Sequence, residues 1–137
     1  MLKFNRRTEY ALLALRFLSA PDRGVVSVHA VAEHYAIPEP LLAKVLQQLK
    51  RGGLTTATKG AAGGYTLTRQ LDKVPLMEVL DLFDESTHLV SCLEQENGCD
   101  CHLHPACDIR DGMMSLNELM TAQLRQLSVE KFFAGQR

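Results

Sequence analysis

The chain has 137 residues, of which 46% are apolar, and its 15 Lys and Arg residues against 16 Asp and Glu residues give a net charge of -1. This length suits one compact domain with an accessory helix and excludes two large independent domains. The apolar stretch after the first residues is broken by Arg16 before it reaches the length of a signal peptide or membrane span. We therefore expect a soluble, cytoplasmic protein that does not enter a membrane.

The net charge hides a strong asymmetry along the chain. Residues 1–73 hold 11 Lys and Arg against 5 Asp and Glu, a net of +6, whereas residues 74–137 hold 4 against 11, a net of -7. Neutralising phosphates supplies most of the non-specific affinity for nucleic acid. The first part of the chain is therefore suited to a polyanion, and the second part is not.

The first half is predicted to contain three helices. Asn5 can cap a helix that runs to Leu18, and Ser27 can cap a second helix over residues 28–34. A turn over residues 35–38 leads to a third helix over residues 39–50, which makes a helix-turn-helix. The inward stripe of this helix is Leu42, Val45, Leu46 and Leu49, and its outward positions are Pro40, Leu41, Ala43, Lys44, Gln47 and Gln48.

A hairpin is predicted to follow the third helix. Gly52 and Gly53 stop the helix, and residues 54–58 and 65–68 have the composition of two strands. The turn between them is rich in glycine and carries Lys59, so the hairpin has a basic tip. We predict a mainly α fold with a small β-hairpin, a winged helix-turn-helix in which residues 1–73 form the DNA-binding region.

The second half divides into four segments. Residues 74–90 are predicted to be a packing helix and linker, and residues 91–107 form a loop without periodicity. Over residues 108–130, apolar side chains recur at helical spacing around much of the circumference, and residues 131–137 form a tail. Such a helix needs a partner surface, so we expect a long C-terminal dimerisation helix and a homodimer. The alternative is that this helix folds back onto its own domain.

All four cysteines lie between Cys92 and Cys107, which suits a local metal or redox site better than a disulfide framework. Clustered thiolates favour an iron-sulfur cluster, zinc or copper(I). We expect Cys107 at the start of the long helix, where the dipole stabilises a thiolate. The absence of a Cys-x-x-Cys pair counts against zinc, which stays an alternative, as does a regulatory dithiol. His102 and His104 flank the same loop and are further candidate ligands.

No nucleophile in the sequence is accompanied by a recognisable base, orienting group and oxyanion site. We therefore expect that the protein is not an enzyme.

Several of these segments together resemble the Rrf2 (Rrf-two) family of iron-sulfur transcriptional regulators, which has IscR-like and NsrR-like members. The resemblance covers nearly the whole chain. It is carried by residues 2–12, by residues 37–54, by the wing 59–67 with its Gly-Gly-Tyr ending, and by Cys101-x5-Cys107. It implies a repressor that binds a double-stranded DNA operator and senses redox, nitric oxide or iron status. The alternative is a regulator of the same fold without a cluster, controlled by thiol oxidation, zinc or a partner protein.

The resemblance also implies a set of cluster ligands. By position these are Cys92, Cys101, Cys107 and Glu9 from the other subunit, with Cys99 as an additional thiol that could replace Cys101. Arg110 stands where IscR-like members carry a ligating histidine, whereas Glu9 matches the carboxylate of NsrR-like members. This combination favours a 4Fe-4S cluster over 2Fe-2S. A glutamate in a first helical turn also interacts favourably with the helix dipole, which is the plainer explanation.

For DNA, the resemblance implies that the third helix enters the major groove and the wing the adjacent minor groove. The implied contacts are Pro40, Leu41, Lys44, Gln47 and Gln48 on the helix, Lys59 on the wing, and Lys3, Arg6, Arg7 and Lys50 toward phosphates. Ala43 replaces a base-reading glutamate of some members, so the operator sequence is not carried over. The target genes, the signal and the form that binds more tightly are also left open.

Overall fold

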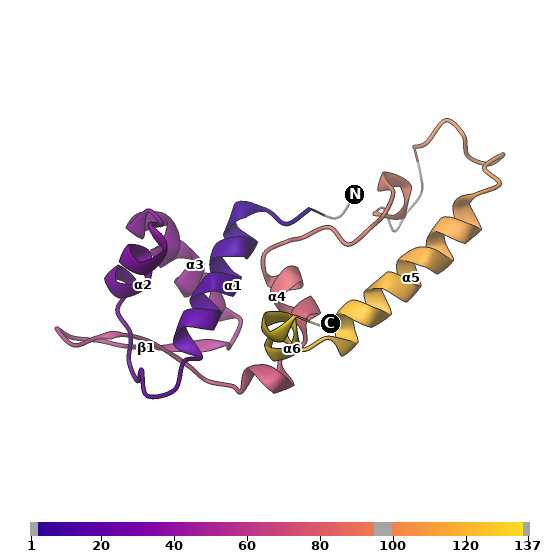
Figure 1. Cartoon of the computed structure of the whole chain (residues 1–137). Helices are drawn as coiled ribbons and strands as arrows, with labels where there is room; N and C mark the ends of the chain where they lie inside the picture. The colour runs from indigo at the N-terminus through magenta and orange to yellow at the C-terminus, as the bar shows by residue number, and fades with distance from the viewer. Residues whose placement is uncertain (1–2, 95–99, 136–137) are drawn as a thin grey trace.

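The computed structural model describes residues 3–94 and 100–135. Figure 1 shows that these residues form several helices and one antiparallel hairpin. The elements are α1 Arg6–Leu18, α2 Val28–Tyr35, α3 Glu39–Arg51, β1 Thr55–Thr58, β2 Gly64–Leu67, α4 Leu76–Leu82, α5 Arg110–Gln126 and α6 Val129–Ala134, with short 3-10 turns at Leu71–Lys73 and Ser91–Leu93. In the part of the chain described, no helix is long and apolar enough to cross a membrane.

The first helices begin at the predicted caps. The Asn5 side chain accepts a hydrogen bond from the Thr8 amide at 2.9 Å, and the Ser27 hydroxyl accepts one from the Ala30 amide at 3.1 Å. Each cap satisfies an amide that has no partner within its helix. The inward stripe predicted for α3 is buried in the common core: Leu42, Val45, Leu46 and Leu49. The predicted fold class, a winged helix-turn-helix, is confirmed.

The hairpin is hydrogen-bonded to the segment between α1 and α2. Thr55 pairs with Leu67 and Thr58 with Gly64 across the two strands. Tyr65 also exchanges two backbone hydrogen bonds with Val26, at 2.8 and 3.0 Å. Gly64 permits this approach, because a Cβ atom there would lie 2.1 Å from the Val26 carbonyl oxygen.

The Gly64→Ala variant is expected to lower the free energy of unfolding by about 1 to 3 kcal/mol, the range for an overpacked site. The added methyl group would break or shift the Val26–Tyr65 hydrogen bonds. The matched control is Gly112→Ala in α5, where a Cβ atom meets nothing within 4 Å; it should be neutral or stabilising by up to about 1 kcal/mol. Chemical denaturation at one protein concentration measures both, and equal stabilities would contradict the prediction.

The C-terminal part differs from the single helix predicted over residues 108–130. α5 ends at Gln126, and the Leu127 carbonyl accepts a hydrogen bond from the Leu76 amide while the Val129 amide donates to Val74, both at 2.8 Å. The Ser128 side chain then caps α6. This pairing with the segment before α4 replaces the hydrogen bonds of a continuous helix. Part of the predicted tail therefore lies in α6, and Val129 is fully buried.

α5 extends away from the other helices, and residues 100–109 lead into its far end (Figure 1). All 17 residues of α5 are described, and none is buried. Exposed apolar side chains on or just before it are Ile109, Met114, Leu116 and Leu119, with Leu119 66% exposed. Leu124 in the last turn packs against the core. The helix therefore does not fold back along its length onto its own domain.

Candidate DNA-binding face and cysteine segment

The side chains predicted to contact DNA are distributed over the start of α1, α3 and the hairpin. Apart from Gln48, all of them are exposed: Lys3, Arg6, Arg7, Pro40, Leu41, Lys44, Gln47, Lys50 and Lys59. Lys59 follows directly after β1, where the chain turns back toward β2. These positions are accessible to a duplex.

Gln48 is placed differently. Its side-chain amide donates a 2.6 Å hydrogen bond to the Leu82 carbonyl at the end of α4, and the residue is half-buried. In the helical pattern, position 48 lies at the edge of the apolar stripe, and the packing of α4 draws it inward. The structure therefore uses Gln48 to join α3 to α4, instead of extending it into solvent with Gln47.

An exposed ionic contact joins α2 to the start of α3. His29 Nδ1 lies 3.1 Å from a Glu39 carboxylate oxygen, and its Nε2 lies 3.7 Å from Glu33. The hydrogen bond to Glu39, with the charges of Glu39 and Glu33, raises the pKa of His29 above its ordinary value of 6.5. The stability from this contact is fully present below pH 6.5 and is lost as the pH rises through the raised pKa. Because the ring is exposed, the contribution is small.

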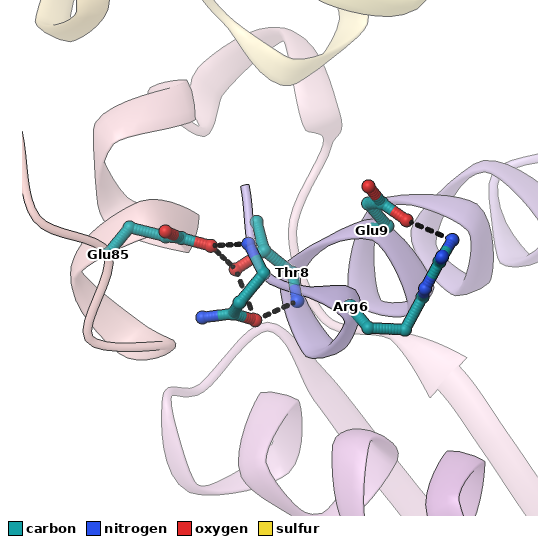
Figure 2. Close-up of polar contacts among 5 residues, drawn as sticks. Arg6, Thr8, Glu9 and Glu85 are labelled. Carbon is teal, nitrogen blue, oxygen red and sulfur yellow. Dashed lines mark hydrogen bonds and ion pairs between the residues drawn. The ribbon is translucent and has the colours of Figure 1, made fainter. Parts of the chain in front are cut away.

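Glu9, the predicted oxygen ligand, lies in the first turn of α1. Its carboxylate forms an ion pair with Arg6 at 2.8 Å, and both side chains are substantially exposed, 43% for Glu9 and 74% for Arg6. Figure 2 shows this pair directed away from Glu85. An exposed ion pair of this kind contributes about 0 to 1 kcal/mol, so Glu9 can exchange partners at low cost.

Glu85 holds the other side of the same helical turn (Figure 2). Its carboxylate accepts hydrogen bonds from the Asn5 amide at 2.6 Å and the Thr8 hydroxyl at 2.5 Å. The Asn5 side-chain amide donates to the Phe83 carbonyl at 3.2 Å. Sequence analysis missed Glu85, because a single glutamate in a polar linker belongs to no motif or periodic pattern.

Three of the predicted cysteine ligands can be placed, whereas Cys99 lies outside the described residues. Cys92, in the turn Ser91–Leu93, and Cys107 are half-buried, and Cys101 is exposed. Cys107 lies ahead of α5, which begins at Arg110. The predicted placement of this thiol at the start of the helix is therefore wrong, because the helix starts three residues later.

The structure does not gather the candidate ligands into a metal site in the part that it describes. There, no group of three or more His, Cys, Asp or Glu side chains could hold a metal ion. His102 and His104 are exposed in the same segment. The chemistry of the donors nevertheless fits an iron-sulfur cluster, since the thiols of Cys92, Cys101 and Cys107 are soft ligands that lie outside the core.

A shallow apolar groove lies beside Glu9, between α1 and α6. Its volume is about 470 Å³, and it is lined by Phe4, Leu12, Leu13, Phe132 and Phe133, with Glu9 and Arg16. Leu13 and Phe132 are partly exposed, at 36% and 37%. The carboxylate thus adjoins an accessible apolar surface.

A helix-turn-helix, a hairpin fastened beside it and accessible basic side chains define a winged-helix transcriptional regulator. The chain belongs to the Rrf2 family: the family model, described as that of an iron-dependent transcriptional regulator, matches residues 4–135. The resemblance seen in the sequence is thereby confirmed. As a member of a family of transcriptional regulators, the protein is not an enzyme.

Individual relatives agree with this assignment. The transcriptional regulator NsrR of Shouchella clausii is 32% identical over 121 residues, which cover 88% of this chain and 78% of the relative. The structure of CymR, the global cysteine regulator of B. subtilis, has a TM-score of 0.76 at 22% identity, with 100% of both chains covered. T. potens IscR has a TM-score of 0.68 at 20% identity, covering 97% of this chain and 87% of that one. The two solved structures share the fold.

Proposed function

We propose that the protein is a cytoplasmic, homodimeric repressor whose binding to an operator duplex is controlled by an iron-sulfur cluster. The observation that carries this proposal is that a member of an iron-dependent regulator family bears three thiols close together in the chain, at Cys92, Cys101 and Cys107, outside the core. The cluster would be held by Cys92, Cys101 and Cys107, with Glu9 of the partner subunit as the oxygen ligand. Cys99 is the alternative thiol, and 4Fe-4S is favoured over 2Fe-2S.

Two features support a dimer. The apolar side chains Met114, Leu116 and Leu119 of α5 are exposed, and pairing with a second copy would bury them. The apolar groove between α1 and α6 offers a further surface next to Glu9. A second copy that covers this groove would bring its own side chains close to Glu9, as a shared ligand set requires.

The residues of this chain would have distinct roles in the sensor. The three thiolates hold the cluster, and Glu9 would leave Arg6 to reach it. An oxygen donor is the weakest partner in a set of thiolates, so it is the ligand that is most readily released. When bound, the cluster would react with oxidants or nitric oxide, and it would be lost when iron is scarce.

For operator binding we propose that α3 enters the major groove and the hairpin the minor groove. Lys44 and Gln47 would reach base edges or phosphates, and Pro40 and Leu41 would contact the duplex from the first turn of α3. Lys3, Arg6, Arg7 and Lys50 would contact phosphates. Gln48 is left out of this set because its amide is engaged by Leu82.

The Lys59→Ala variant is expected to bind all duplexes more weakly and to lower the slope of log affinity against log salt by about one unit, as loss of one phosphate contact does. The matched control is Lys131→Ala, which removes an exposed lysine from α6. Fluorescence anisotropy over a range of salt concentrations measures both. An unchanged slope and affinity in the Lys59 variant would remove the hairpin from the DNA contacts.

A second candidate, a regulator of the same fold controlled by thiol oxidation without a cluster, is favoured by one observation. In the described part of the chain, the donors are not assembled into a metal site. A solved structure with the same fold, S. aureus CymR, is described in an oxidized form.

Purification without oxygen distinguishes the two candidates. The cluster predicts a brown protein that contains iron and acid-labile sulfide and that binds its operator differently once the metal is removed. A colourless protein with stoichiometric zinc would contradict the cluster. Iron-free protein that still responds to oxidants in footprinting would establish the thiol mechanism instead.

A further inference from the structure

A short set of hydrogen bonds connects the first turn of α1 to the last turns of α3 through the end of α4. On one side, Glu85 accepts from the Asn5 amide and the Thr8 hydroxyl, and Phe83 accepts from the Asn5 side chain. On the other side, Leu82 accepts from Gln48 of α3. Residues 82–85 therefore contact both helices within four consecutive positions.

Residues 82–85 pack closely against both α1 and α3. Thr8 has no exposed surface, so the turn that carries it is held against its neighbours (Figure 2). At the other contact, a Cβ atom on Gly52 would lie 2.6 Å from a Leu82 methyl carbon. The ends of α3 and α4 therefore pack directly against each other. A displacement of residues 82–85 would consequently move the end of α3.

We propose that Glu85 is a positioning residue that couples the place of Glu9 to the orientation of α3. This inference rests on the proposed role of Glu9, which follows Thr8 in the same helical turn. When Glu9 is drawn toward a partner subunit or released to Arg6, the first turn of α1 shifts. Glu85 transmits that shift to residues 82–85, and Gln48 transmits it to the helix that would read the operator.

Substitutions at Glu85 can separate the effect of its charge from the effect of its hydrogen bonds. Its carboxylate lies at the N-terminal end of α1, where negative charge is favourable, and it accepts two hydrogen bonds through one oxygen. A glutamine side chain keeps that carbonyl oxygen and can accept both bonds, but it lacks the charge. An alanine removes the connection and leaves Asn5 in place as the cap.

Hydrogen exchange of the cluster-free, full-length protein tests the coupling directly. In Glu85→Ala, amides of the first turn of α1 and of the last turns of α3 should both exchange severalfold faster than in the wild type. Glu85→Gln should restore slow exchange in both regions. Faster exchange in α1 alone, with α3 unchanged, would overturn the proposal.

Operator binding then tests the coupling in the sensor. The probe is a duplex selected by the wild-type protein from random sequence, and the readout is the ratio of its Kd values with and without the cluster. If the wild-type ratio is at least about fivefold, the low end of allosteric coupling, it should fall toward one in Glu85→Ala, at unchanged iron content, and recover in Glu85→Gln. An unchanged ratio in Glu85→Ala would overturn the proposal while the cluster mechanism stands.

Two further results keep the outcomes distinct. A wild-type protein that takes up no iron would refute the proposed function, whereas the exchange experiment would still decide whether α1 and α3 are coupled. If Glu85→Ala fails to fold, Thr8→Val replaces it, since valine keeps the shape of the buried side chain and removes the hydroxyl donor. It should accelerate exchange in both regions to a smaller extent, and acceleration in α1 alone would again refute the coupling.

Discussion

The Cys107→Ala protein, purified without oxygen, is expected to be colourless and to retain almost no iron or acid-labile sulfide. Removing one of three thiolates from the proposed ligand set leaves an iron atom without a strong protein donor. The fold should survive, because Cys107 is half-buried and lies outside the core. We expect the stability to change by less than about 0.5 kcal/mol, as for other substitutions outside the core. The same loss of visible absorption is expected for Cys101→Ala.

The control for these variants is Ser91→Ala, which removes a hydroxyl from the same segment and leaves the thiols unchanged. Visible absorption, iron content and sulfide content are measured side by side. Full absorption in Cys107→Ala would show that the ligand set is wrong. Cys99→Ala, compared with Cys101→Ala, then shows which of these two thiols the cluster uses.

The Leu119→Glu variant is expected to be monomeric at concentrations at which the wild type is a dimer. Leu119 is 66% exposed near the middle of α5, so a carboxylate there would be buried without a partner in the proposed interface. Glutamate is a good helix former, so the helix itself should persist. Because two linked half-site contacts bind far more tightly than one, operator affinity should fall by about 100-fold or more.

Sedimentation analysis measures the mass, and anisotropy with the selected duplex measures the affinity. Glu118→Gln, at the neighbouring exposed position, is the matched control and should remain dimeric. A dimeric Leu119→Glu protein would show that α5 does not form the interface. The exposed apolar face of this helix would then require another partner.

Local features made the first half of the fold predictable. The caps Asn5 and Ser27, the four-residue apolar stripe of α3 and the glycine-rich turn each depend on residues close together in the chain. The resemblance to the Rrf2 family rested on the same segments. Placement of the exposed cationic side chains followed, since a helical period is enough to separate an inward from an outward face.

The candidate site was predicted less completely, because its geometry depends on contacts between distant residues. The Glu85 hydrogen bonds join residues up to 80 positions apart, and no sequence motif predicts them. Gln48 turned inward because α4 offers it a carbonyl group. The predicted C-terminal helix broke at Leu127, where backbone pairing with the segment before α4 competes with helical hydrogen bonds.

By itself, then, the sequence determined the first three helices, the caps Asn5 and Ser27, the hairpin and the residue types available for DNA and metal, since each of these follows from short-range spacing and chemistry. Tertiary structure alone decided that α5 extends from the other helices with Leu116 and Leu119 exposed, that Cys107 precedes the helix, and that Glu85 connects the first turn of α1 to the end of α4. These outcomes depend on which surfaces meet after folding. A periodic pattern specifies that a face is apolar, but it does not specify what covers that face.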